Sequence, residues 1–77
     1  IKLKPDYAEA HYNCGVVLRE LEQEENAIKS FRLAIKFKKN YGEAYYNLGH
    51  IFFERKKFNE ALQNFYHHPL QMIYQGW

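Results

Sequence analysis

The chain has 77 residues, of which 47% are hydrophobic, 18% aromatic and 26% charged, with a formal net charge of +2. A composition this rich in apolar and aromatic residues excludes disordered and collagen-like proteins, and the short length allows only one thin core. The single cysteine excludes an internal disulfide, and the net charge is too small to imply nucleic-acid binding by itself.

The sequence carries no targeting signal that we recognise. It has no apolar run of about 18 residues and no charged-then-apolar leader, so we expect neither a membrane span nor a signal peptide. The lack of a disulfide framework predicts a cytoplasmic protein, with the nucleus as the alternative. The first residue is Ile1 rather than Met, so the chain is expected to be a fragment of a longer one.

An internal repeat with a period of 34 residues is the strongest pattern in the chain. The shift superposes Tyr7 on Tyr41, Glu9 on Glu43, Tyr12 on Tyr46, Asn13 on Asn47, Gly15 on Gly49, Ala27 on Ala61 and Phe31 on Phe65. The repeat divides the chain into the end of a preceding unit (1–6), a first repeat (7–40), a truncated second repeat (41–68) and a tail (69–77).

Each repeat is predicted to contain two helices. Asp6 with Glu9, and Asn40 with Glu43, have the spacing of a capping box, so first helices should begin near Tyr7 and Tyr41. Helical spacing then predicts two packing stripes, formed by His11, Cys14, Gly15 and Leu18 and by Tyr45, Leu48, Gly49 and Phe52. The second helices are marked by Ala27, Ile28, Phe31, Ala34 and Ile35, and by Ala61, Leu62 and Phe65.

Small residues on these stripes predict close packing of the paired helices. Gly15 and Ala27 would allow an interaxial distance at the lower end of about 8 Å, with Ala27 lying against the first helix near Gly15. Cys14 has no cationic neighbour on its stripe, and we therefore interpret it as a small buried hydrophobic residue rather than a reactive thiol.

These residues resemble the tetratricopeptide repeat family over roughly residues 1–66. The resemblance is carried by 10–15 with Leu18, Ala27, Phe31 and Ala34, and by 44–49 with Phe52, Phe58, Ala61 and Phe65. It implies an all-α superhelix of helix-turn-helix repeats, here about two repeats and the end of a preceding one. Such superhelices serve as scaffolds that bind proteins or peptides.

The chain departs from the family pattern at several positions. Glu22 and Lys56 stand where the family often has a turn glycine, and Lys39 replaces a closing proline. Pro69 is expected to end or kink the last helix, after which the tail to Trp77 has three open interpretations: a short helix, a disordered end or a misread exon.

The resemblance implies a concave groove lined by the first helix of each repeat. The candidate peptide-binding residues on that face are Glu9, Tyr12, Asn13, Val16, Glu43, Tyr46, Asn47, His50 and Phe53. A side-chain amide can both donate to and accept from a peptide backbone, and the superhelix of the O-linked N-acetylglucosamine transferase type uses an asparagine ladder in this way. Asn13 and Asn47 are therefore candidate ladder residues, or else only solvated helix residues.

Other functions are weaker hypotheses. The groove positions lack the lysines and arginines with which a related subfamily holds chaperone tails, and the histidines lack metal-ligand spacing, so we expect neither that partner, nor a metal, nor a cofactor. The favoured function is a scaffold that binds an extended peptide without catalysis and is prone to self-association through exposed repeat ends. The alternatives are the substrate-recognition arm of a larger enzyme, such as a glycosyltransferase, and an RNA-binding helical repeat.

Overall fold

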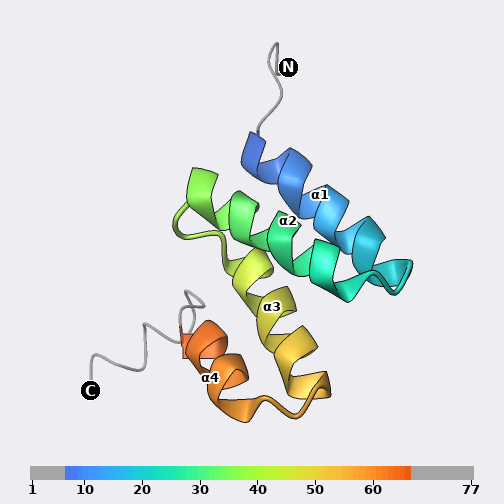
Figure 1. Cartoon of the computed structure of the whole chain (residues 1–77). Coiled ribbons are helices and arrows are strands. Elements are labelled where there is room, and N and C mark those ends of the chain that lie inside the picture. The colour runs from blue at the N-terminus through green and yellow to red at the C-terminus, as the bar shows by residue number, and fades with distance from the viewer. Residues whose placement is uncertain (1–6, 67–77) are drawn as a thin grey trace, which may run out of the picture. The chain divides into compact units, whose positions relative to one another are not determined.

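Four α-helices and no strand are present in residues 7–66, which are the residues that the computed structural model describes (Figure 1). The helices are α1 (Tyr7–Glu20), α2 (Glu24–Phe37), α3 (Gly42–Glu54) and α4 (Phe58–Tyr66). The predicted all-α helical repeat class is thus confirmed. The predictions for Asp6, the His67-His68-Pro69 segment and the tail lie outside the described residues.

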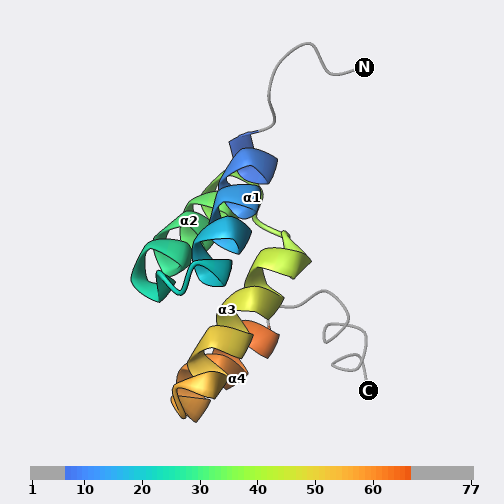
Figure 2. The same cartoon turned by 90° about the vertical axis from the view of Figure 1, so that its right-hand side faces the viewer.

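The helices pair in sequence order into two compact units. In both views α1 runs alongside α2, and α3 runs alongside α4, with a tight turn at one end of each pair (Figure 1, Figure 2). The first unit ends at Lys39 and the second begins at Asn40. Each unit is therefore a helix hairpin with its own internal packing.

Both first helices end in the same backbone motif. In the first unit the Gln23 amide donates to the Leu18 carbonyl at 2.8 Å, and the Glu22 amide donates to the Arg19 carbonyl at 2.9 Å. This pair of bonds is a Schellman motif, which places Glu22 in the left-handed region at a φ of 63°. The sequence-based expectation of a turn glycine at this position therefore corresponds to a real conformational demand.

The second unit repeats this motif 34 residues later. The Lys57 amide donates to the Phe52 carbonyl at 2.8 Å, the Lys56 amide donates to the Phe53 carbonyl at 2.9 Å, and Lys56 has a φ of 62°. The period read from the sequence is thus also the period of the backbone conformation.

The predicted capping box at the start of the third helix is wrong. The N-cap is Tyr41 rather than Asn40, and no side chain caps the helix. The Ala44 and Tyr45 amides instead donate to the Tyr41 carbonyl at 3.1 and 3.2 Å. The helix thus begins one residue later, at Gly42, than the Asn40 and Glu43 spacing predicted.

A phenylalanine ring lies directly against the helical glycine in each hairpin. A Cβ atom added to Gly15 would lie 2.7 Å from Cε1 of Phe31, and one added to Gly49 would lie still closer to Phe65. Phe31 is fully buried, as is Ala27 one turn before it. The predicted close approach at Gly15 is therefore confirmed, with the ring of Phe31 as the group that the glycine admits.

The predicted burial of Cys14 is wrong, because its side chain is exposed. The equivalent residue of the second unit, Leu48, is only 2% exposed. The same stripe therefore contributes to the core in α3 but remains on the surface in α1. The other core residues are Ala8, Ile28, Ala34, Tyr41, Ala44, Ile51, Phe52 and Ala61.

Candidate functional site

None of the nine candidate peptide-binding residues is buried. Glu9, Asn13, Glu43, Tyr46 and Phe53 are exposed, and Tyr12, Val16, Asn47 and His50 are half-buried. The first four residues in chain order, Glu9, Tyr12, Asn13 and Val16, lie on α1, and the other five lie on α3. Each of the two helices therefore presents its own set of candidate residues at the surface of its own hairpin.

The α3 set contains a cluster of three rings. The ring centroid of Tyr46 lies 4.8 Å from that of His50 and 6.0 Å from that of Phe65, and the His50 and Phe65 centroids are 6.3 Å apart. The Tyr46 hydroxyl and Nε2 of His50 are 3.0 Å apart, within hydrogen-bond distance. The contacts orient the Tyr46 ring, which is nevertheless 49% exposed, so it is an ordered aromatic surface group.

The α1 set contains only part of this cluster. The Tyr12 ring lies 5.7 Å from the Phe31 ring, which matches the Tyr46 and Phe65 pair after the 34-residue shift. Val16 occupies the position of His50, so the hydrogen bond to the tyrosine hydroxyl has no counterpart there. Tyr12 and Tyr46 therefore share a packing role on the phenylalanine of the second helix, and α3 adds a polar contact.

The asparagine geometry gives no specific support to a peptide-reading ladder. The Asn47 side-chain amide donates to the Glu43 carbonyl at 2.9 Å, one turn earlier in its own helix. Asn64 makes the same bond to the Glu60 carbonyl, at 2.8 Å, on α4. Because the bond recurs on a helix outside the candidate set, it reflects local helix geometry and does not mark a binding role.

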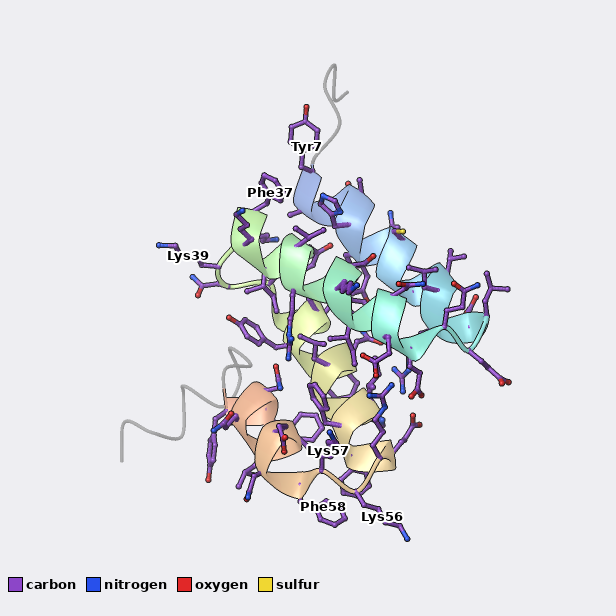
Figure 3. The ribbon with its side chains drawn as sticks, in the orientation of Figure 1. Tyr7, Phe37, Lys39, Lys56, Lys57 and Phe58 are labelled. Carbon is purple, nitrogen blue, oxygen red and sulfur yellow. The ribbon has the colours of Figure 1, made fainter. Side chains whose placement is uncertain are left out.

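Two exposed aromatic contacts were missed by the sequence analysis. Phe53 and Phe58 have ring centroids 5.4 Å apart across the α3–α4 turn, and the two rings are 54% and 55% exposed. At the other end of the first hairpin, Tyr7 and His11 contact Phe37 at 5.7 and 5.5 Å (Figure 3). Only the pairing of the helices brings these rings together, although their apolar character on exposed faces was a readable signal.

The described residues offer binding chemistry and no evident metal site. Within residues 7–66, no group of three or more histidine, cysteine, aspartate or glutamate side chains could hold a metal ion. In the same part of the chain no helix is long and apolar enough to span a bilayer. The surface described above can form hydrogen bonds and aromatic contacts with another chain.

Comparison with known proteins identifies the repeats. A family model described as "TPR repeat" matches residues 15–54, more than half of the chain, and one described as "Tetratricopeptide repeat" matches residues 42–67. Neither the curated proteins nor the solved structures give a significant match. These matches include both turns with a left-handed residue and both helical glycines, so the chain belongs to the tetratricopeptide repeat family.

Proposed function

We propose that this chain is a protein-interaction module in which the exposed faces of α1 and α3 contact an extended segment of a partner. Tetratricopeptide repeats generally mediate protein–protein interaction, and the candidate residues are all at the surface. In this proposal the segment performs no catalysis, binds no cofactor and acts in the cytoplasm.

The observation that carries the proposal is the pair of exposed aromatic rings on α3. Tyr46 and Phe53 are seven residues apart, so they lie on the same side of the helix at a separation of about 10 Å along its axis. Their exposures are 49% and 54%, and each is held by a neighbouring ring, Phe65 or Phe58. Ordered aromatic groups lose little conformational freedom on binding and are enriched among the residues that dominate interface energies.

A binding screen with matched variants tests this function. The 77-residue chain would be screened against an array of unrelated peptides, and hits would be measured by calorimetry with Tyr46→Ala and Phe53→Ala. Loss of an interface aromatic should weaken binding at least about fivefold. The control is Tyr66→Ala on α4, which removes a similarly exposed ring outside the candidate face. Equal affinity in all four proteins would contradict the assignment of the face.

The same surface would serve if the chain is the substrate-recognition arm of a larger enzyme, such as a glycosyltransferase. In that case the peptides bound would be substrates of the catalytic part, and the same two aromatic variants would lose them. Binding of RNA would instead require a loss of affinity with added salt, and it would not depend on Tyr46 or Phe53 in the same way.

A further inference from the structure

A basic stripe runs along the outer face of α2. A shallow, open hollow of about 430 Å³ is lined, among the described residues, by Lys29, Arg32, Leu33 and Lys36. Their spacing of i, i+3, i+4 and i+7 places all four on one side of the helix. Over that length the axis rises only about 10 Å, so three positive charges are concentrated around one leucine.

The stripe is not needed for the fold of the hairpin. The buried residues of α2 are Ala27, Ile28, Ser30, Phe31 and Ala34, and they lie on the opposite side of the helix. All four stripe residues are exposed, with Leu33 at 39%. Three like charges so close together repel one another, and a ligand of opposite charge would relieve that repulsion.

From this arrangement we propose that the outer face of α2 is a second interaction surface, which binds an acidic peptide segment with an apolar residue between its carboxylates. The carboxylates accept hydrogen bonds from Lys29, Arg32 and Lys36, and the apolar side chain packs on Leu33. The short footprint fits about four extended residues, at roughly 3.3 Å each. The proposal goes beyond the faces of α1 and α3 and does not depend on them.

Three observations favour a peptide over a nucleic acid. No aromatic ring lines the hollow among the described residues, so bases would have no surface on which to stack. Phe37, the nearest aromatic residue along α2, is already in ring contact with Tyr7 and His11. Glu24 and Glu25 in the first turn of the same helix would repel a continuous phosphate backbone.

The same features disfavour a membrane surface. An interfacial helix needs an apolar face that enters the lipid, whereas this face exposes a single leucine between cations. The acidic first turn, with Glu24 and Glu25, would also face the anionic headgroups that the stripe attracts. A short acidic peptide can occupy the basic part of the helix alone and avoid that turn.

The probe that we would use is a fluorescein-labelled peptide with two glutamates on either side of a leucine, and its glutamine counterpart. Fluorescence anisotropy with the 77-residue chain should show binding of the glutamate peptide that weakens with added salt. Lys29→Glu combined with Lys36→Glu should lower the affinity at least tenfold. Leu33→Ala should lower it less, about two- to fivefold, because it removes the apolar contact and leaves the charges.

The matched control is Lys39→Glu combined with Lys57→Glu, which changes the net charge by the same amount at exposed lysines outside the hollow (Figure 3). It should change the affinity less than about twofold. A second variant, Lys29→Gln with Lys36→Gln, introduces no new charge on the helix and should also lose binding. Circular dichroism confirms that each variant keeps its helices.

Several results would overturn the proposal. They are equal binding of the glutamate and glutamine peptides, an equal loss in the control variant, and no binding by the parent chain. Tighter, stripe-dependent binding of single-stranded oligouridylate or of vesicles that contain phosphatidylserine would assign the surface to nucleic acid or to membranes. Unchanged peptide binding in Tyr46→Ala is expected, and it separates this surface from the α3 face.

Discussion

The two left-handed residues at the hairpin turns, Glu22 and Lys56, are each held by the bonds of a Schellman motif. A side chain at positive φ is strained because its Cβ approaches the backbone, whereas glycine has no Cβ. Glu22→Gly and Lys56→Gly should therefore each raise the free energy of unfolding by about 0.5 to 1 kcal/mol, as measured by urea denaturation.

The matched control for these turn variants is Gln23→Gly. Gln23 follows Glu22 in the same turn but has a φ of −97°, which any residue adopts. Glycine there should be neutral or destabilising, because it only adds freedom to the unfolded chain. Stabilisation by Gln23→Gly equal to that of Glu22→Gly would mean that the left-handed conformation is not the cause.

The helical glycines give a prediction of opposite sign. Ala is the better helix former by up to about 1 kcal/mol, so Gly15→Ala would stabilise an unobstructed helix. Here the new Cβ would meet Cε1 of Phe31 at 2.7 Å, so overpacking should instead cost about 1 to 3 kcal/mol. Thermal or urea unfolding of the variant measures the difference.

A double-mutant cycle provides the control for the glycine. Phe31→Leu opens space beside Gly15, so Gly15→Ala should be less destabilising in that background than in the parent. Independent, additive effects would show that the ring is not the obstacle. Both variants remain hydrophobic, so the comparison does not introduce a buried polar group.

At the scale of the helix, the two asparagines on first helices can be separated from ordinary helix residues. If they read a peptide backbone, Asn13→Ala and Asn47→Ala should weaken binding by about 1 to 3 kcal/mol, which is about 5- to 150-fold, and similarly for unrelated peptides. Asn64→Ala is the control, because its amide makes the same bond within a helix as Asn47 does. Calorimetry with peptides from the array measures all three.

An equal, small effect at Asn47 and Asn64 would leave only the local bond as the role of Asn47. In that case the exposed rings of Tyr46 and Phe53 alone would define the α3 face. A large effect at Asn47 with none at Asn13 would restrict backbone reading to the second repeat.

The sequence was sufficient for features that depend on neighbours along the chain. The period of 34 residues, the helix pairs, the close approach at Gly15 and the turn positions Glu22 and Lys56 all follow from local spacing or from the family pattern, and they are confirmed. Helix ends are less determined. Asn40 and Glu43 have the spacing of a capping box, yet Tyr41 takes the N-cap position because its carbonyl accepts the first bonds.

Features that depend on what covers a face could not be predicted in the same way. Cys14 and Leu48 occupy equivalent positions on equivalent stripes, but only Leu48 is buried. The contact of Phe53 with Phe58 depends on how the α3–α4 turn brings two helices together. Periodicity identifies the side of a helix that packs, whereas burial is decided by the presence of a neighbour on that side.

At the scale of the whole molecule, one face of α1 is uncovered where its counterpart on α3 is covered. Tyr7 is 62% exposed and Tyr41 8%, while Val17 is 53% exposed and Ile51 0%. Leu21, at 62%, extends the exposed face of α1 toward its end. A repeat protein is stabilised by the contacts of each unit with its neighbours, so a chain of about two repeats with such a face should be marginally stable.

We therefore expect the isolated chain to self-associate through this face as its concentration rises. Sedimentation velocity from low to high micromolar concentration should show a growing average mass, and Val17→Glu should suppress it by placing a charge in the apolar contact. Leu62→Glu on α4, at a residue 52% exposed, is the matched control and should leave association unchanged.

Cys14 reports on the same face because its thiol lies between the positions of Tyr7 and Val17 along α1 and is exposed. Its modification by a thiol reagent should be rapid in dilute solution and should slow as the chain associates, since a partner that packs on this face covers the sulfur. In Val17→Glu the modification rate should no longer depend on protein concentration. Association with an unprotected Cys14 would assign the contact to another surface, and a monomer with a sharp, cooperative melt would show that two repeats are stable with the α1 face in water.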